Sequence, residues 1–295
     1  MESLVTVIVP SYNRAHLLER TIPTYMQEGV KEIILVDDCS LDNTTEVVRR
    51  LQLKYPNLKY IRQPKNMRQT AAKNRGLENV TTEWVYFGDD DSVLYPGSIK
   101  LLYETCIKNK VEACGAIAYY MQPGEEIMDL DDFVKKHRVF ADSIADIVRV
   151  EDMYANFTYS VRQPVVVPFC QACLLMKADI AKRVKFDTCY TGNAYREETD
   201  FIIRCSAEGA TFMFDSRAAQ INLPPTMATG GARNKSKWKY KRDMVVNNWR
   251  FLRKNYPFMK RKFHLHKGIY RMQWDFTIAF VTRPLKRLFR KTVKE

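Results

Sequence analysis

The sequence predicts an α/β protein built around a doubly wound, mostly parallel sheet, with a basic helical extension at its C-terminal end. Two patterns predict this fold class. Short apolar runs rich in β-branched residues alternate with longer amphipathic runs, and polar clusters directly follow several of the apolar runs. The chain has 295 residues, of which 46% are hydrophobic and 27% are charged. This length and composition are typical of one large globular domain with an appendage.

The N-terminal third contains four predicted strands. Residues 5–9 are a near-continuous β-branched run, as expected for a strand that is buried on both faces. We expect strands over residues 5–9, 32–36, 58–62 and 84–87. We expect helices over residues 17–28 and 69–78, and a further helix that runs from an N-cap at Ser40 or Asp42 to about Leu53. Strands and helices that alternate in this way form a parallel sheet, whose ligands bind beyond the carboxyl ends of the strands.

The later elements are spaced more widely. They are a helix after Pro96 to about Asn109, strands over 113–120 and 171–176, a helix over 197–208 that is closed by Gly209, and a last strand from Thr211. Residues 122–165 mix acidic, aromatic and basic side chains without a clear period, and we interpret them as an insertion or a mobile loop. We therefore expect one domain over residues 1–232 and a helical tail over 233–295.

The predicted tail carries the basic character of the chain. Residues 233–295 contain 20 Lys and Arg but three Asp and Glu, a net charge of +17. Because the whole chain has a net charge of +13, residues 1–232 carry −4. The tail also interleaves many aromatic residues with its cations. This composition fits a helix at an anionic membrane surface, a site for single-stranded nucleic acid, or aromatics that pack on the main domain under solvated charges.

Three polar clusters lie at the expected strand ends, where they would converge on one edge of the sheet. They are residues 11–13, residues 37–38 and the acidic triplet of residues 89–91. In an extended chain, Asp89 and Asp91 share one side because side chains alternate. Two converging carboxylates need a cation, and hard oxygen ligands suit Mg²⁺ or Mn²⁺, which in turn bridge a diphosphate. The sequence therefore predicts a metal and diphosphate site at the triplet.

Five segments, residues 5–14, 36–44, 71–76, 88–92 and 196–201, resemble in this order the motifs of family 2 glycosyltransferases with the GT-A fold. The resemblance covers about residues 4–255, and the order of the motifs makes it specific. It implies a GT-A Rossmann-like catalytic domain that takes a sugar from a nucleotide-sugar donor. The sugar would pass with inversion to an acceptor hydroxyl, in glycan, polysaccharide or glycolipid synthesis. If residues 122–165 are a mobile loop, we expect that loop on the acceptor side.

The resemblance also implies which residues contact the donor. Tyr12 would stack on the nucleobase, Asp38 would accept a hydrogen bond from it, and Arg233 would pair with the diphosphate. Arg68 stands where relatives often have Gly, and it would either reach the donor phosphates or lie on the surface. The full set of donor-contacting residues is Pro10, Tyr12, Asn13, Arg14, Asp38, Arg68, Lys73, Asp89, Asp90 and Arg233. Because Lys73 lies in a predicted helix, it is equally well explained as a solvated surface lysine. By the same resemblance the donor is expected to be a UDP- or dTDP-sugar rather than a GDP-sugar.

Metal binding follows from the same resemblance. Asp91 would be the direct ligand of Mn²⁺ or Mg²⁺, and Asp89 would lie near both the metal and the ribose. Asn222 stands where relatives often have a His. An amide is a poorer ligand than an imidazole, so we expect donor phosphates and water to complete the metal's shell.

An inverting transfer is a single displacement, which needs a base to deprotonate the acceptor hydroxyl. The resemblance places this base in the acidic cluster of Glu197, Glu198 and Asp200. Glu198 best matches the family's base position, where many relatives have Asp, and Asp200 is the second candidate. The same cluster also reads as a charged first helical turn that the helix dipole favours.

Two other functions fit parts of the sequence. A nucleotidyltransferase would also use carboxylates and a metal, but it usually needs a Gly-rich phosphate loop, which is absent from residues 10–20. A nucleic-acid-binding module could use the basic tail, but it leaves the acidic strand ends unexplained, so nucleic acid is the disfavoured partner. We expect instead a glycan or lipid-linked acceptor.

The expected location is the cytoplasm, with peripheral attachment to the cytoplasmic membrane face if the tail binds lipid. The seven cysteines are scattered and odd in number, which fits reduced thiols. The first residues also lack the basic and apolar regions of a signal peptide.

Overall fold

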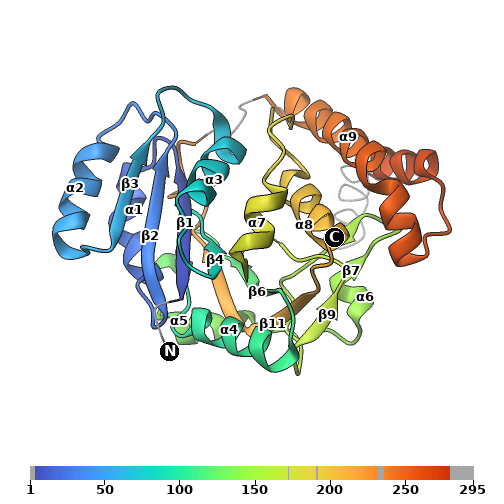
Figure 1. The fold of residues 1–295 in the computed structure, drawn as a ribbon, viewed down its shortest axis with the longest axis horizontal. Helices are drawn as coiled ribbons and strands as arrows, with labels where there is room; N and C mark the ends of the chain where they lie inside the picture. The colour runs from blue at the N-terminus through green and yellow to red at the C-terminus, as the bar shows by residue number, and fades with distance from the viewer. Residues whose placement is uncertain (1–3, 172, 191, 232–235, 280–295) are drawn as a thin grey trace, which may run out of the picture.

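The computed structural model describes residues 4–171, 173–190, 192–231 and 236–279 (Figure 1). The strands are β1 (Val5–Ser11), β2 (Val30–Asp37), β3 (Leu58–Arg62), β4 (Trp84–Phe87), β5 (Ser92–Leu94), β6 (Ala113–Tyr120), β7 (Val148–Arg149), β8 (Tyr154–Ala155), β9 (Val165–Val167), β10 (Leu174–Lys177) and β11 (Phe212–Asn222). The α-helices are α1 (Ala15–Thr21), α2 (Thr44–Lys54), α3 (Arg68–Glu78), α4 (Ser98–Asn109), α5 (Leu130–His137), α6 (Ile144–Ile147), α7 (Ala178–Val184), α8 (Glu197–Ala207) and α9 (Lys237–Phe263). Two 3₁₀ turns are η1 (Ile22–Tyr25) and η2 (Glu125–Ile127).

One large sheet runs through the described part of the chain. Its strand order is β3-β2-β1-β4-β10-β6-β11-β5, and β9 also pairs with β11. The first four strands in this order are parallel. Antiparallel pairs enter through β10, β5 and β9. The expected doubly wound α/β fold is confirmed, with its parallel half at the N-terminal side.

Both faces of the sheet are covered. Along β1, Val5, Val7 and Val9 belong to one buried cluster, while Ile8 belongs to the other. Helices α1, α2 and α4 contribute to the first cluster, and α3, α7, α8 and α9 contribute to the second. Because side chains alternate along a strand, a strand that is covered on both faces needs apolar residues at successive positions. This explains the near-continuous apolar run over residues 5–9.

Several predicted boundaries differ from the structure by a few residues, and three of these differences change an element's course or start. The helix expected over 17–28 is instead α1 followed by η1, because Pro23 lacks the N–H that a continuing α-helix needs. The helix expected to begin after Ser40 or Asp42 begins at Thr44, with Asn43 in the N-cap position. The strand expected over 171–176 begins three residues later, as β10, and continues directly into α7.

Residues 122–165 contain short regular elements, namely η2, α5, α6, β7, β8 and the first residue of β9. The side chains of Phe133 and Ile147 are fully buried and belong to the cluster on the α8 side of the sheet. The ring of Phe133 meets that of Tyr119 edge-on, with centroids 6.0 Å apart. The insertion is therefore packed on the sheet by its own apolar side chains.

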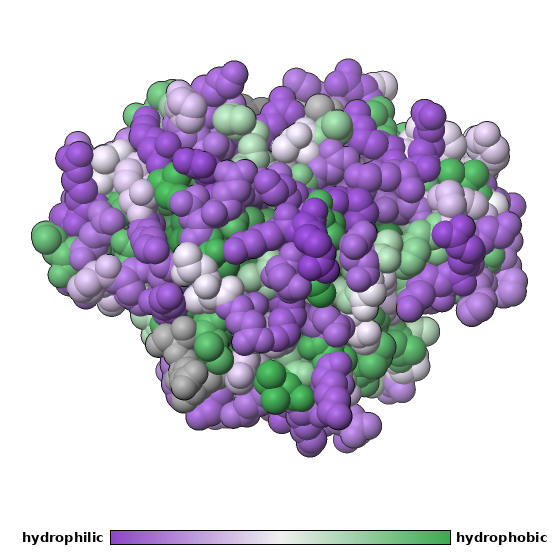
Figure 2. All heavy atoms as spheres, viewed as in Figure 1, coloured by the Kyte–Doolittle hydropathy of each residue, from purple (hydrophilic) through white to green (hydrophobic). Residues whose placement is uncertain are grey.

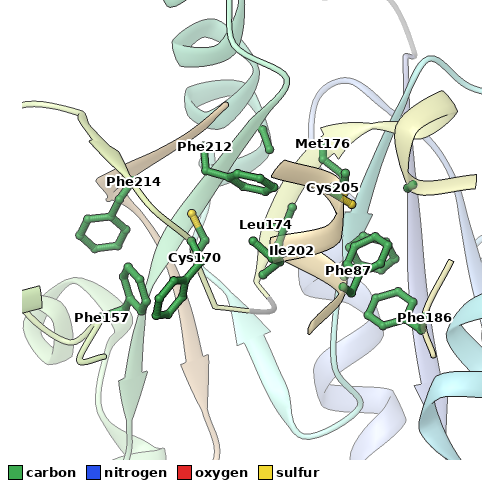
Figure 3. Close-up of a cluster of buried hydrophobic side chains, with 14 of the residues drawn as sticks. Phe87, Phe157, Cys170, Leu174, Met176, Phe186, Ile202, Cys205, Phe212 and Phe214 are labelled. Atoms are coloured by element: carbon green, nitrogen blue, oxygen red, sulfur yellow. The ribbon is translucent and has the colours of Figure 1, made fainter. Parts of the chain in front are cut away.

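An aromatic cluster holds α8 against the sheet. Phe87 ends β4, Phe186 follows α7, and Phe201 lies in α8. The rings of Phe186 and Phe201 are stacked with centroids 4.0 Å apart, and Phe87 meets both rings edge-on. Figure 3 shows Phe87 beside Phe186, with Ile202 of α8 nearby. These contacts fix the first turn of α8 relative to the end of β4.

The described part of residues 233–295 packs on this domain. Helix α9 lies against α8, and its buried face includes Met244, Asn248, Phe251 and Leu252. A second helical segment covers residues 269–279. One face of α9 therefore matches the third interpretation of the tail, in which its apolar side chains pack on the main domain. Within the described ranges, no helix combines the length and the apolar character needed to cross a bilayer. The face in Figure 2 is largely hydrophilic, with smaller hydrophobic areas between the polar side chains.

Candidate active site

The carboxyl ends of three adjacent parallel strands place the polar clusters together. Ser11 at the end of β1 pairs with Asp37 at the end of β2, and Ile8 of β1 pairs with Phe87 at the end of β4. Residues that follow these strands therefore share one edge of the sheet. Pro10 is buried in β1, while Tyr12 is half-buried just beyond it.

Asp89, the first residue of the triplet, is held by two residues that the sequence did not single out: Tyr25 contacts its backbone and Gln220 contacts its side chain. The Tyr25 hydroxyl accepts a hydrogen bond from the Asp89 N–H and donates one to its carbonyl, at 3.0 and 2.9 Å. The Gln220 amide donates to Asp89 Oδ2 at 3.0 Å. A Cβ on Gly88 would lie 2.8 Å from the Tyr25 ring, so the close approach requires glycine. Neither Tyr25 nor Gln220 lies in a motif, and only their contacts reveal them.

The electrostatics of Asp89 are those of a crowded, desolvated carboxylate. Burial raises the pKa of Asp89 to about 7, Lys73 opposes the rise, and the carboxylates of Asp91 and Glu198 add to it. Asp89 therefore lies within electrostatic reach of both the rest of the triplet and α8.

Arg14 is paired with the other two carboxylates of the triplet. Its Nη1 atom lies 2.6 Å from Asp90 Oδ1 and 2.9 Å from Asp91 Oδ2. Burial opposes the charge of Arg14, but Asp90 and Asp91 outweigh it and raise the pKa of the guanidinium. Burial raises the pKa of Asp90, and the charge of Arg14 opposes this rise. The guanidinium thus neutralises part of the triplet.

Asp38 organises the loop before α3. Its carboxylate accepts hydrogen bonds from the N–H groups of Met67 and Arg68, both at 2.7 Å, and from the Gln63 amide at 3.1 Å. Burial raises the pKa of Asp38 despite these donors. Arg68 has a left-handed backbone with φ of 73° and an exposed side chain. Asn13 joins the segment after β1 to the segment after β2, since its side chain accepts a hydrogen bond from the Leu41 N–H at 2.7 Å.

Lys73 joins α3 to the acidic turn of α8. The side chain is 1% exposed, so the surface interpretation of this lysine is wrong. Its Nζ lies 2.6 Å from Glu198 Oε1 and 5.1 Å from the Phe186 ring centroid. Burial disfavours the charge, but Glu198, Glu197 and Asp89 together raise the pKa of Lys73. A buried, charged lysine is therefore bonded to the predicted base and lies within electrostatic reach of Asp89 in the triplet.

The three acidic residues of α8 have different surroundings. Asp200 is fully buried, and its oxygens accept from Arg204 at 2.7 Å and from Asn255 at 2.8 Å, with Lys254 at 3.2 Å. Glu197 is also buried, and its Oε2 has no hydrogen-bond partner within the described residues. Glu198 is one-third exposed and lines a cavity of about 350 Å³. Of the three, Glu198 combines exposure to a cavity with a fixed cationic partner.

The carboxylate oxygens of Asp89 and Asp91 are the kind of ligand that a hard divalent cation prefers, and the negative charge of the crowded triplet favours binding of such a cation. The Asn222 side chain is already hydrogen-bonded within the protein, because it accepts from the Ser92 hydroxyl and donates to the Tyr119 carbonyl, both at 3.0 Å. Across the part of the chain that the structure describes, no group of three or more His, Cys, Asp or Glu gathers as a metal site. A metal here would take further ligands from a donor diphosphate and water.

A loop after β11 lies over the end of β1. A Cβ on Gly230 would lie 2.2 Å from the Asn13 carbonyl oxygen, and one on Gly231 would lie 3.0 Å from Arg14. His16 contacts the Met227 carbonyl at 3.0 Å. The glycines therefore permit a backbone approach to the predicted donor site. Arg233, the predicted phosphate contact that follows this loop, lies outside the described residues.

The family is shown by the sequence match. Residues 6–184 match the family described as glycosyl transferase family 2. A GalNAc(5)-diNAcBac-PP-undecaprenol beta-1,3-glucosyltransferase of Campylobacter jejuni is 38% identical over 103 residues, 34% of this chain and 33% of that protein. A cholesterol galactosyltransferase of Borreliella burgdorferi is 33% identical over 101 residues, 34% of this chain and 28% of that protein. The matched part spans about a third of these curated relatives.

Solved structures agree in fold. The mannosyltransferase PcManGT from Pyrobaculum calidifontis, in complex with GDP-Man and Mn²⁺, has a TM-score of 0.60 and 19% identity, covering 100% of this chain and 80% of that one. TarS 1–349 of S. aureus in complex with UDP has a TM-score of 0.55 and 18% identity, covering 93% and 78%. At these identities the likeness concerns the fold alone. With more than half of its length matched by the family, this GT-A-like chain belongs to glycosyl transferase family 2.

Proposed function

We propose that the protein transfers a sugar, with inversion, from a nucleoside-diphosphate sugar to an acceptor hydroxyl in glycolipid or polysaccharide synthesis, and that it depends on Mn²⁺ or Mg²⁺. The observation that carries this proposal is the arrangement around Lys73. This lysine bonds to Glu198 at 2.6 Å and acts electrostatically on Asp89, which supports a shared site for the base candidate and the acidic triplet. Family membership favours sugar transfer over nucleotidyl transfer and over nucleic-acid binding.

On the donor side, Asp91 and Asp89 are the proposed metal ligands. Tyr12 and Asp38 would contact the nucleobase beside Pro10 and Asn13, and Arg14 and Arg68 would lie near the phosphates. A bound Mn²⁺ or Mg²⁺ would supply charge neutralisation for the departing diphosphate. The expected preference for UDP or dTDP over GDP is not carried forward, because the solved relatives include complexes with GDP-Man and with UDP.

On the acceptor side, Glu198 is the proposed base. It would accept the proton of the acceptor hydroxyl as that oxygen attacks the anomeric carbon and the nucleoside diphosphate leaves. The ion pair with Lys73 holds the Glu198 carboxylate in position. Asp200 does not fit this role as well, because its two oxygens are bonded to Arg204, Lys254 and Asn255. We assign Asp200 to holding α9 against α8.

A lipid-linked acceptor would bring the protein to an anionic membrane surface, and we propose that its C-terminal helices contact that surface. Tyr270, Trp274 and Ile278 follow one another at intervals of four in the helical segment 269–279, and all three are exposed. The net charge of +17 over residues 233–295 complements anionic lipid. The name of the Campylobacter relative includes an undecaprenol-linked acceptor, which supports the same proposal.

The proposed donor class can be tested by a thermal-shift screen of UDP, dTDP and GDP, each with and without Mn²⁺. We expect one of these nucleotides to raise the melting temperature, and to do so more strongly with Mn²⁺, because metal and diphosphate bind together. The nucleotide that binds identifies the sugar donors to assay next. If none of them shifts the melting temperature with or without metal, the donor proposal is wrong.

A further inference from the structure

A cavity of about 350 Å³ opens beside Glu198, within the size range of small-ligand sites. Its wall comes from the end of β6, from residues 155–158, from the segment before β10 and from the first turn of α8. Aromatic rings of Tyr120, Phe157 and Phe169 line it together with polar groups such as Asn156 and Gln171. Figure 3 labels two of its lining residues, Phe157 and Cys170. Rings and amides together are suited to a sugar.

Arg196 also lines this cavity, and its charge is not balanced by a carboxylate. The side chain is 9% exposed. Its Nε donates to Asn248 Oδ1 at 3.1 Å and its Nη2 donates to the Met153 carbonyl at 3.0 Å. Both partners are neutral, and within the described residues no carboxylate lies within 4.0 Å of the guanidinium and nothing accepts from Nη1. Buried cations are normally paired, so this arrangement calls for a partner.

The aromatic surroundings hold the guanidinium in place without neutralising it. Its carbon lies 4.7 Å from the Tyr195 ring centroid, and 5.8 and 5.7 Å from those of Phe251 and Phe276. Burial lowers the pKa of Arg196, although an arginine stays charged in any accessible range of pH. The residue is thus a fixed, desolvated positive charge at the wall of a cavity.

The backbone adds further donors at the same place. Arg196 occupies the N-cap of α8 with a left-handed φ of 74°, which is uncommon for a residue with a side chain. The next N–H groups that enter the helix are those of Glu198 and Thr199, and within the described residues neither donates to a backbone or side-chain acceptor. Both residues line the cavity. A helix N-terminus and a buried guanidinium therefore meet there, a combination that favours anions.

Glu198 does not cancel this positive character. Its carboxylate is already paired with Lys73 at 2.6 Å, so the cavity wall retains the charge of Arg196. We propose that the cavity receives the acceptor and that Arg196 binds an oxyanion on it, a phosphate or a carboxylate close to the hydroxyl that reacts. This inference rests on the proposed function, because it takes Glu198 as the base toward which that hydroxyl points.

Titration of small anions tests the inference. Methyl phosphate and acetate would each be titrated, at constant ionic strength, into full-length protein that is saturated with Mn²⁺ and with the nucleotide found by thermal shift, so that the donor site is occupied. We expect at least one anion to bind, and Arg196→Gln to weaken its affinity about tenfold, as loss of a charge-assisted hydrogen bond should. Preference for methyl phosphate would indicate a phosphorylated acceptor, and preference for acetate would indicate an acidic sugar.

Two further variants control for structural damage. Arg217→Gln removes an exposed arginine that pairs with Asp215 outside the cavity, and it should leave anion affinity unchanged. Ala155→Trp fills the cavity while Arg196 stays in place, and it should reduce anion affinity even if Arg196→Gln fails to fold. Equal anion affinity in wild type, Arg196→Gln and Ala155→Trp would overturn the inference.

The anion result can be separated from the donor proposal. Nucleotide affinity, measured in parallel, should be unchanged in Arg196→Gln, because Arg196 lines the cavity proposed for the acceptor and is not among the proposed donor contacts. If no nucleotide binds even to wild type, the donor proposal fails. The same anion titration on nucleotide-free protein then still decides whether Arg196 holds an oxyanion.

Discussion

The Nη1 atom of Arg14 lies 2.9 Å from Oδ2 of Asp91, so the first strand end supplies a cation to the carboxylate proposed as the metal ligand. The same nitrogen contacts Asp90 at 2.6 Å. A cation that binds Asp91 must therefore compete with a guanidinium that is already in place. This relationship couples the metal site to a residue of the first motif that we propose to lie near the donor phosphates.

Arg14→Gln should raise the affinity for Mn²⁺ alone by several fold, because the metal no longer displaces a bound cation. The same change should weaken nucleoside-diphosphate binding, because a charged donor to the phosphates is lost. Calorimetric titration of Mn²⁺ without nucleotide measures the first effect. Weaker Mn²⁺ binding in this variant would show that Arg14 supports the metal site instead of competing for it.

Asp91→Asn should reduce metal-dependent nucleotide affinity about 100-fold while the fold survives, because an amide replaces the negatively charged ligand. Isothermal titration with the nucleotide and Mn²⁺ provides the measurement, and circular dichroism checks the fold. Asp179→Asn, an exposed aspartate on α7, is the matched control and should bind like wild type. Unchanged affinity in Asp91→Asn would remove Asp91 from the metal site.

Glu198→Gln should lower the rate of sugar transfer by about 10²- to 10⁴-fold and leave nucleotide affinity unchanged, because the base is lost but the donor site is not. The matched control is Glu208→Gln at the exposed C-terminal end of the same helix, which should retain full activity. The test is the rate of sugar transfer at saturating donor for wild type and both variants, with their melting temperatures as a check of the fold. If Glu198→Gln transfers sugar as fast as the control variant, Glu198 is not the base.

The stability of the protein should fall as pH rises through the region where Glu197 ionises. Burial raises the pKa of Glu197 to about 8, Lys73 opposes the rise, and Glu198 and Asp89 add to it. In the unfolded chain this carboxyl ionises near its ordinary value of about 4.5. Between those two values the folded state holds more protons, so the free energy of unfolding decreases with pH, by roughly 2 kcal/mol from pH 5.5 to 7.5.

Urea unfolding of wild type and Glu197→Gln at these two pH values tests this linkage. The amide cannot ionise, so the variant should lose less stability than wild type over the same interval. Asp89, with a pKa raised to about 7, contributes in the same direction in both proteins, so the difference between them reports Glu197 together with its interaction with Asp89. Parallel pH dependence in the two proteins would mean that Glu197 does not titrate in this range.

Replacing Tyr270 and Trp274 together by Ser should release the protein from vesicles that contain phosphatidylglycerol. Both side chains are largely exposed, so the fold should tolerate the change, whereas a truncation would remove the buried Leu265 and Met272. Leu53→Ser, an exposed apolar residue on α2, is the control and should sediment with vesicles like wild type. Wild-type protein that never sediments with these vesicles would exclude the membrane proposal.

The first four strands and the acidic triplet could be predicted from sequence because they depend on local pattern. β-Branched runs report burial on both faces of a strand, and polar residues directly after such runs report a strand end. Pro23 shows where local pattern was misread, since its missing N–H ends α1 early. Helix α7 was not predicted, because it directly follows β10 and both are short.

The roles of single side chains depended on contacts across the chain. By sequence Lys73 was a donor contact or a surface lysine, and the structure buries it against Glu198, 125 residues away. Arg196 lies in a motif but received no role until its burial and neutral partners were known. The sequence thus determined the fold class, the family and the acidic strand end. Tertiary structure decided which charges are desolvated and paired, because burial and pairing arise only when distant segments pack together.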